Sequence, residues 1–523
     1  MKDMSGTMLL SGDQNGLGWD VPLKLAVLTD RGYRVEHSLH TTDLFSRPSS
    51  EGSALVEVTK EAYLDSGNVN RWTASLEAAP FLGQMPIAPA AFTERGVDLR
   101  RVATFHNRPL REIVLSLTQG EWLGLSRRAE GRIAHDMSMG DVLSHFPALR
   151  KPLRANLRES VEPHHHIAAL QAFDQLFNLS EDTTLPWPLA TQRVLKETLA
   201  RYGGCGGVTL TTTLDAFSRG KDCVRSLLLP IFLEHYRVVR LAYNEAISGP
   251  GEVMMPLRDD DLPFYAVLRD RDGRLKRVDL TYQLGDTVSR VLNRARKDGE
   301  VVAVVGKAIP HIIELLMEGP VVMCEAASAY IPRVARFAEL LETQYGIPLD
   351  LRPVVRVRLN ALDALSDVPH HFLLPAYLRS RFHTEWISGI DFAARWKQVV
   401  AEAEKDLGTL AGKDNMSFLR SQGRLSERVC NLIDSVRDSI VLCGKERAKQ
   451  HGVPDNLSMF KRTLVALLDG VEAERAAMMR ELLAITVSLP YWNCRPFVHW
   501  VDALPGWSDA IRRRAEIVTS PLY

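Results

Sequence analysis

Residues 320–359 read PVVMCEAASAYIPRVARFAELLETQYGIPLDLRPVVRVRL, and this stretch decides the expected fold. Its first part, PVVMCEAAS (320–328), is a short apolar run that ends in a polar turn. Apolar residues then recur at helical spacing through 329–347, and a β-branched run follows at 351–359. A strand, an amphipathic helix and a strand in this order predict a β-α-β unit with two parallel strands.

Two further stretches show the same succession of strand-like and helix-like apolar patterns. Near the start, MLLSG (8–12) predicts a strand, PLKLAVLTDRG (22–32) a helix and YRVEHSLHTTD (33–43) the next strand. Upstream of the quoted stretch, VVAVVGK (301–307) and AIPHIIELLMEG (308–319) predict a strand and a helix that lead into it as one more β-α-β unit. We therefore predict an α/β protein with a Rossmann-like core built on a parallel sheet.

A hairpin is predicted over residues 264–280, where two apolar runs flank the turn residues 271–274. Later in the chain Gly and Pro thin out, and two apolar stripes at helical spacing predict an antiparallel helical hairpin. This hairpin could form either an exposed coiled coil or a helix pair that packs into the core. The stripes are Phe418, Leu425, Val429, Leu432, Val436 and Cys443, then Leu457, Phe460, Leu464, Leu467, Val471, Met478 and Leu482.

These differences in composition and apolar spacing divide the chain into three parts. We expect an α/β core over 1–388, a helical hairpin or coiled coil over 389–489, and a C-terminal segment over 490–523 that returns to the core. The hairpin, over 412–485, is a candidate surface for a homodimer. Residues 490–507 are rich in aromatic and apolar side chains. Because such side chains are usually buried, we expect this C-terminal segment to pack against the α/β core.

Composition narrows the classes of function. The 523 residues contain 64 Lys and Arg and 64 Asp and Glu, so the net charge is zero and a dedicated nucleic-acid binder is disfavoured. No apolar run is long enough to cross a membrane, and the first residues lack a signal-peptide pattern. The six cysteines form no CxxC pair, which is typical of reduced thiols in a cytoplasmic protein.

The opening loop SGDQNGL is the first candidate binding element. A glycine-containing turn between a strand and a helix N-terminus offers backbone N–H groups to an anion, and the helix dipole adds partial positive charge. Gly12 and Gly16 permit close backbone approach, while Gln14 and Asn15 offer side-chain amides. An ordinary β-to-α turn is the alternative, since the loop matches neither a Walker motif nor a dinucleotide-binding fingerprint.

Other polar residues follow predicted strands, where ligands bind in open α/β sheets. His40 and Asp43 follow the second strand and could position a metal or act as a base and its orienting partner, with a capped turn as the alternative. Glu325 follows the strand 321–324 and is a candidate base, with Tyr330 nearby. The histidines, including His164 to His166, show no metal-ligand spacing, so no metal site is predicted and no cofactor is indicated.

The strand, the loop SGDQNGL and the following Pro-Leu resemble the opening of the cysteine-adding enzymes of bacillithiol biosynthesis. Those proteins begin with a TGQQPGL-like loop. The order of the later segments is also similar, and VVRVRLNAL resembles a late strand of that family that carries an arginine, here Arg358. The matching positions in the opening are Gly12, Gln14, Gly16, Leu17, Pro22 and Leu23.

The resemblance implies a ligase that joins cysteine to the amino group of a glucosaminyl malate. In that case the opening loop and Arg358 would hold an anionic part of a sugar-malate or nucleotide-like substrate. His40 or Glu325 would accept the proton of the attacking amine. The chain departs from the family in its acidic, His-containing signature and in its Gly-Gly-Pro-Gly-Glu turn, which is MCEAAS here. The second hypothesis is therefore a non-catalytic α/β scaffold that dimerises or binds a partner through its helical hairpin.

Overall fold

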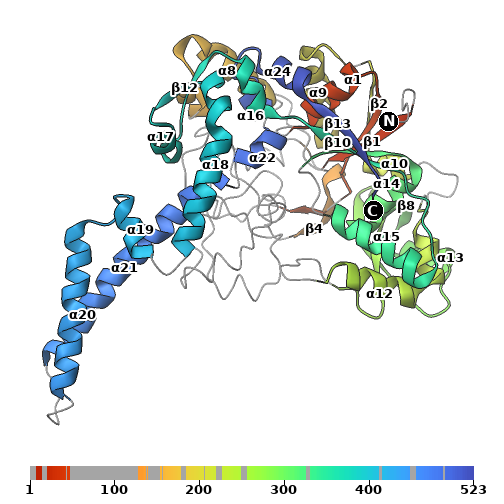
Figure 1. Ribbon diagram of the computed structural model, residues 1–523. Coiled ribbons are helices and arrows are strands. Elements are labelled where there is room, and N and C mark those ends of the chain that lie inside the picture. Colours follow the sequence, from red (N-terminus) through yellow and green to blue (C-terminus); the bar gives the residue numbers. More distant parts are fainter. Residues whose placement is uncertain are drawn as a thin grey trace.

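The structure is a computed structural model, and all structural statements concern the residues that it describes. These are residues 7–13, 20–42, 44–46, 128–136, 138, 154–155, 157–177, 184–204, 206–218, 226–248, 256–325, 330–411, 415–447, 455–483, 485–486, 489–496 and 498–522. Two β-sheets with helices packed around them form the body of the molecule, and a pair of long helices extends away from it (Figure 1).

The larger sheet has six strands in the order β13-β10-β9-β1-β2-β5. Five of them are parallel, and β13 pairs antiparallel with β10 at one edge. The prediction of an α/β protein with a largely parallel sheet is confirmed. The bounds are β1 Met8–Asp13, β2 Arg34–Leu39, β5 Val208–Thr212, β9 Val321–Cys324, β10 Val354–Arg358 and β13 Glu516–Ser520.

The central strands are buried on both faces, which explains their continuous apolar runs. Val322 and Cys324 of β9 belong to one hydrophobic core, while Val321 belongs to another. On β10, Val355 belongs to the same core as Val322 and Cys324, and Val354 belongs to the same core as Val321. Because successive side chains of a strand point to opposite faces, the sheet separates two cores, here called the first and the second core.

Helices cover both faces of this sheet. The first core receives buried side chains of α1 (Val21–Asp30), α9 (Trp187–Arg201) and α24 (Trp507–Arg514). The second core receives those of α12 (Tyr236–Ala246), α14 (Ile309–Glu318) and α15 (Ile331–Tyr345). The remaining helices of the body are α8 His166–Phe177, α10 Thr213–Ser218, α11 Leu229–Glu234, α13 Val288–Ala295, α16 Ala361–Ala364, α17 Ala376–Phe382, α22 Leu489–Cys494 and α23 Val498–Val501.

The second sheet has five strands in the order β3-β4-β7-β6-β8, and all its pairings are antiparallel. The predicted hairpin is confirmed, because β6 and β7 pair and Gly273 in the turn adopts a φ of +80°. The bounds are β3 Leu44–Ser46, β4 Arg128–Ile133, β6 Asp261–Arg269, β7 Leu275–Thr281 and β8 Glu300–Gly306. A short ribbon of β11 (His371–Leu373) and β12 (Trp386–Ser388) is separate.

One strand lies in a different sheet from the one predicted. The run VVAVVGK forms β8, but β8 pairs antiparallel with β6 in the second sheet, whereas β9 lies in the larger sheet. The segment β8-α14-β9 therefore connects two sheets and is not a parallel β-α-β unit. A buried β-branched run specifies a strand without specifying its partner, and the hairpin strand β6 offers an open edge here.

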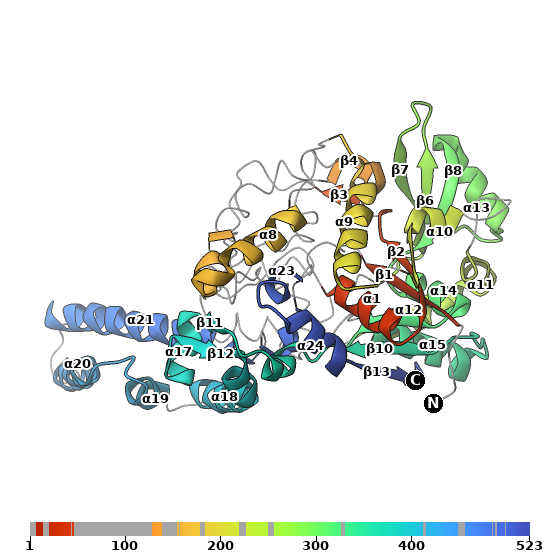
Figure 2. The ribbon, with the colours of Figure 1, turned by 90° about the horizontal axis from the view of Figure 1, so that it is seen from above.

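The helical region follows β12. Its helices are α18 Gly389–Ala411, α19 Asn415–Ser421, α20 Glu427–Arg447 and α21 Asp455–Leu483. Helices α20 and α21 lie side by side and project from the body, with α18 and α19 at their base (Figures 1 and 2). Among the described helices, none combines the length and the apolar character needed to cross a bilayer.

The predicted stripes agree with burial only in part. Leu457, Val471, Met478 and Leu482 are buried on α21, as is Val436 on α20. Leu432, however, is 45% exposed, and its neighbour Ile433 is fully buried instead. The apolar spacing locates the helices correctly, but it misplaces this contact by one residue, because a helix turns by about 100° per residue.

Candidate functional site

The candidate site lies at the carboxyl edge of the larger sheet. Gly12 pairs with Ser38 near the end of β1, and Cys324 pairs with Val357 at the ends of β9 and β10. Glu325 and Arg358 therefore emerge at the same edge as Gly12. Parallel strands always bring their carboxyl ends together, so residues that are far apart in the chain share one rim.

The order of the strands contains a point where the connections reverse direction. From β1 the chain passes through α1 to β2 on one side, and from β9 it passes through α15 to β10 on the other. Helix α1 lies against the first core and α15 against the second, on opposite faces of the sheet. The point of reversal therefore lies between β1 and β9, which is where open α/β sheets commonly bind small molecules.

Glu325 and Arg358 form an ion pair beside this point. The Arg358 Nε donates to Glu325 Oε1 at 2.6 Å, and Arg358 Nη1 lies 3.6 Å from Glu516 Oε2. The hydrogen bond to Glu325 raises the pKa of the guanidinium, which stays charged. The side chains of Arg358 and Glu325 are partly open to solvent, with relative exposures of 43% and 38%. Arginine has five N–H donors, so these contacts leave donors for an anionic ligand.

Two cysteines flank this ion pair, and burial separates their chemistry. Cys324 is fully buried, and its burial next to the Asp20 carboxylate raises the pKa of its thiol well above the usual value. A protonated, enclosed thiol is not a nucleophile. Cys494, at the end of α22, is partly exposed and places its Sγ 3.8 Å from Glu325 Oε2. No pattern in the sequence pointed to Cys494, because it is 169 residues away from Glu325.

A buried ion pair supports the rim from within. Asp20, directly before α1, is 1% exposed, and its Oδ1 accepts a hydrogen bond of 3.1 Å from Arg495 Nε. Arg495 Nη1 also donates to the hydroxyl of Tyr491 at 3.2 Å. The pair fastens the start of α1 to the segment after α22. Sequence reasoning missed it, because the two residues stand 475 positions apart.

A polar contact also crosses the first-core face of the sheet. His37 of β2 and Ser11 of β1 are buried, and His37 Nδ1 lies 3.0 Å from Ser11 Oγ. Burial, and to a lesser extent the charge of Lys24, lowers the pKa of His37 well below its ordinary value. The imidazole is therefore neutral and holds two strands together within the protein interior.

His40 lies at the same edge but not beside Glu325. Strand β1 stands between β2 and β9, so the spacing of the strands puts about 10 Å between their ends. His40 Nδ1 lies 3.2 Å from Thr213 Oγ1, and its ring lies 4.9 Å from that of His311. These contacts fit the structural alternative for this segment, and strand β1 separates His40 from Glu325 along the rim.

The residues after His40 join the two sheets. The backbone N–H of His135 donates to the carbonyl of Thr41 at 2.8 Å, and Thr42 Oγ1 lies 2.7 Å from the hydroxyl of Tyr265. Both threonines are buried. Thr41 and Thr42 thus form a structural junction between β2 and the second sheet.

Several predicted site residues fall outside the described part of the chain. They are Gln14, Asn15, Gly16 and Asp43. Gly12 is exposed, and a Cβ there would stand 3.7 Å from the carbonyl of Ser38, so packing does not require glycine. Tyr330 precedes α15 as its N-cap residue, makes no capping hydrogen bond with its side chain, and packs half-buried against the second core.

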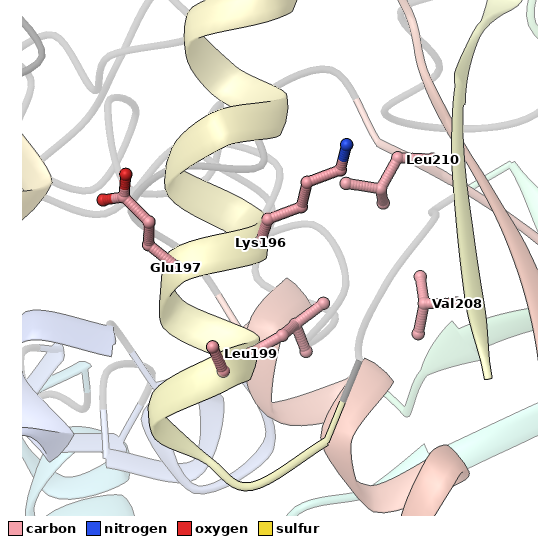
Figure 3. Close-up of a pocket in the computed structure, with 6 residues that line it drawn as sticks. Lys196, Glu197, Leu199, Val208 and Leu210 are labelled. Atoms are coloured by element: carbon pink, nitrogen blue, oxygen red, sulfur yellow. The ribbon is translucent and has the colours of Figure 1, made fainter. Parts of the chain in front are cut away.

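A hollow of about 410 Å³ lies elsewhere, between α9 and the edge strand β5. Its lining is mainly aliphatic, and in Figure 3 Lys196 points from α9 toward Leu210, while Glu197 points to the other side. Val208 and Leu210 belong to the first half of β5, away from the carboxyl edge. The two ionisable residues of this lining, Lys196 and Glu197, point to different sides of α9 and do not converge on one point, so we do not place the chemistry there.

Comparisons with known proteins add no assignment. No protein-family model matches the chain, and neither a curated protein nor a solved structure is significantly similar to it. The functional conclusion therefore depends on the geometry of the site.

Proposed function

We propose that this protein is a ligase-like enzyme that binds a small anionic substrate at the carboxyl edge of the larger sheet and forms a C–N bond there. In this proposal it is a divergent relative of the cysteine-adding enzymes of bacillithiol biosynthesis, and its larger sheet is Rossmann-like. The observation that carries the proposal is the Glu325–Arg358 pair, at 2.6 Å, beside the point where the connections reverse. A cation and a carboxylate that are both partly exposed suit an anionic group and an amine.

The roles follow from charge and position. Arg358 binds a carboxylate or phosphate of the substrate through its remaining N–H donors. Glu325 accepts the proton that the attacking amine loses as it becomes an amide nitrogen. The buried pair of Asp20 and Arg495 holds the rim in place, since it joins the start of α1 to the segment after α22.

The reaction in this proposal joins the carboxyl carbon of an amino acid to the amine of an amino sugar. A free carboxylate is a poor acyl donor, so in this proposal ATP first activates the carboxyl group as an acyl phosphate or acyl adenylate. The amine then displaces phosphate or AMP as the C–N bond forms, and the assay compares arms with and without ATP. The chain carries no Walker loop, and in this proposal a nucleotide would bind through the same rim. Cysteine and glucosaminyl malate are the first substrates to test.

The test measures binding before turnover. Saturating L-malate and glucosaminyl malate are each added to the full-length protein, and the midpoint of thermal unfolding is recorded. A ligand at about 100 times its dissociation constant stabilises the folded state by roughly 2.7 kcal/mol. We expect an upward shift for the wild type and none for Arg358→Ala. Mass spectrometry then detects the condensation product, which Glu325→Gln should reduce at least about 100-fold.

Arg352→Ala is the matched control. Arg352 lies before the other end of β10, with a side chain that is 52% exposed and 3.1 Å from Asp350. Its loss should leave the ligand-induced shift unchanged. The proposal is wrong if neither ligand shifts the unfolding midpoint of the wild type, or if Arg358→Ala responds like the wild type.

The second candidate is a scaffold that dimerises through α20 and α21. It is favoured by large apolar side chains that remain exposed on these two helices. Single exposed apolar residues are common, but here several occur on one projecting element. They are Leu432, Val441, Leu442, Met459 and Val465.

A further inference from the structure

Four metal-ligating side chains converge outside the site described above. They are Glu162, His164, His165 and His370, and one ligand atom of each lies within 4.8 Å of all the others. The first three lie at the 3₁₀ turn that precedes α8, and His370 directly precedes β11. Helix α8 and the β11–β12 ribbon occupy the same end of the molecule (Figures 1 and 2).

The backbone holds these two segments in register. Val161 and Phe372 form an antiparallel bridge, and both are buried. Glu162 Oε2 accepts a hydrogen bond of 3.4 Å from the backbone N–H of His371. The carbonyl of His370 accepts another of 3.0 Å from Gly389 N–H. The cluster is therefore built on paired backbone and not on freely moving surface chains.

The turn explains how neighbouring histidines can converge. In the 3₁₀ turn Pro163–His165 the N–H of His165 donates to the carbonyl of Glu162 at 2.8 Å. The tight turn folds Glu162 back over the histidines, so the helical i, i+4 rule does not apply to them. The prediction of no metal site relied on ligand spacing along the sequence, and that spacing cannot show that the distant His370 joins the cluster.

The distances suit a small tetrahedral ion. His165 Nε2 lies 3.1 Å from His370 Nδ1, and His164 Nε2 lies 3.9 Å from Glu162 Oε2. Ligands at the usual Zn–N distance of about 2.0–2.1 Å are roughly 3.4 Å apart in a tetrahedron. These two separations lie on either side of this value, and all four ligand atoms lie within 4.8 Å of one another, so side-chain rotations would bring them to tetrahedral spacing.

The donor set selects the class of metal. Three imidazoles and one carboxylate suit Zn²⁺, whereas Mg²⁺ and Ca²⁺ prefer shells made of oxygen. Four protein ligands leave no position for a reacting water, which is typical of a structural site. His165 is buried and His164 is 63% exposed, so an ion can reach the cluster from solvent.

We propose that Glu162, His164, His165 and His370 bind one Zn²⁺ in a four-coordinate structural site that fastens the start of α8 to the β11–β12 ribbon. This site is independent of the proposed catalysis. A hydrogen-bonded pair of His165 and His370, with no metal, is the alternative that the experiment must separate from it.

The test uses the full-length protein and zinc itself. After treatment with a chelator, the protein is dialysed against Zn²⁺ or Mg²⁺, and the bound metal is measured by mass spectrometry. We expect one Zn²⁺ per chain, no bound Mg²⁺ at the same concentration, and a higher midpoint of thermal unfolding with Zn²⁺. Co²⁺ in place of Zn²⁺ should give the intense visible absorption of tetrahedral coordination.

The variants separate a metal site from a hydrogen-bonded pair. His164→Ala and His370→Ala should each weaken Zn²⁺ binding at least about 100-fold, because each removes a ligand. His371→Ala is the matched control, since His371 is an exposed neighbour whose backbone alone contacts Glu162, and it should bind Zn²⁺ like the wild type. Absence of stoichiometric zinc, equal binding of Mg²⁺, or unchanged affinity in His164→Ala and His370→Ala would each overturn the proposal.

Discussion

Burial decides which ionisable side chains of this protein are available for chemistry. Cys324 and Glu325 are adjacent in the sequence, yet Cys324 is fully buried and Glu325 is exposed at the rim. The alternation of a strand explains the difference, because Cys324 faces the first core whereas the chain turns into solvent at Glu325. A sequence pattern that contains both residues cannot separate their roles without this geometry.

Glu314 is a second case in which burial matters, here for stability. It lies on α14, is 1% exposed, and its Oε1 accepts hydrogen bonds from Ser226 Oγ and, at 3.4 Å, from Leu228 N–H. Burial raises the pKa of Glu314 to about 8. The carboxyl therefore stays protonated at neutral pH and supports the start of α11, which begins at Leu229.

We expect Glu314 to make the protein less stable as the pH rises. Folding raises the pKa of the Glu314 carboxyl. The contribution of this carboxyl to the free energy of unfolding is therefore fully present below the unfolded pKa and is lost as the pH rises through about 8. Each unit of pKa difference corresponds to about 1.4 kcal/mol. Urea unfolding at about pH 5 and about pH 9 should show a smaller loss of stability for Glu314→Gln than for the wild type.

The control for this experiment is Glu300→Gln. Glu300 begins β8 and is exposed, so its replacement should leave the pH dependence of the wild type unchanged. An identical pH dependence in the wild type and Glu314→Gln would show that Glu314 does not titrate in this range.

At the scale of elements, the turn between β8 and α14 is a tight connection with little room for side chains. It carries the chain from the second sheet into the helix that leads to β9. Ala308 adopts a φ of +44° there, and a Cβ on Gly306 would stand 2.6 Å from the His311 nitrogen. The same Cβ would stand 2.7 Å from the carbonyl carbon of Pro310, which is also backbone and cannot rotate away.

We predict that Gly306→Ala destabilises the protein by roughly 1–3 kcal/mol, the usual cost of overpacking a site that cannot relax. Gly408→Ala is the matched control. Gly408 is exposed within α18, and a Cβ added there would meet no atom within 4 Å, so alanine should stabilise by about 0.5–1 kcal/mol. The shift in the midpoint of thermal unfolding reports the change in stability of each variant. Equal effects of the two substitutions would contradict the close approach described for this turn.

At the scale of the whole molecule, α20 and α21 form a projecting arm (Figure 1). Their packing buries Ile433 and Leu457, but each helix also carries apolar residues that face solvent. A second copy of the chain would cover such residues if the arm forms a dimer, which is the second candidate function.

The arm can be tested with charge substitutions at its surface. Val441 and Leu442 are 51% and 62% exposed, so glutamate at both positions should not disturb the fold of the monomer. Light scattering should show a dimer for the wild type and a monomer for the Val441→Glu, Leu442→Glu variant. Leu284→Glu, at a position that is 87% exposed on the body, is the control. A wild type that is monomeric, or a variant that still dimerises, would exclude this contact.

Local patterns predicted the local structure well. The strands near 8–12 and 320–324, the helix at 329–347 and the hairpin at 264–280 are present, because the period of the apolar residues determines whether a segment packs as a strand or a helix. The parallel order of β9 and β10 also followed, since a strand, a helix and a strand in succession leave few other connections.

From the sequence, only those residues of the candidate site that lie at the ends of predicted strands could be found. Glu325 was a candidate because it follows a predicted strand, and Arg358 because of the family resemblance. Parallel strands align their ends, and the two side chains meet at this rim at 2.6 Å. Asp20, Arg495 and Cys494 were missed, because side chains that stand outside the repeating pattern come together through packing of distant segments.

The sequence by itself determined the α/β class, most of the central elements and the edge at which polar residues gather, because these depend on hydrophobic periodicity and chain connectivity. Only the tertiary structure decided that β8 joins a separate sheet, that β13 closes the larger sheet beside β10, and that His370 meets Glu162, His164 and His165. The physical reason is that a strand edge or an imidazole accepts many partners, and the packing of the whole chain selects one.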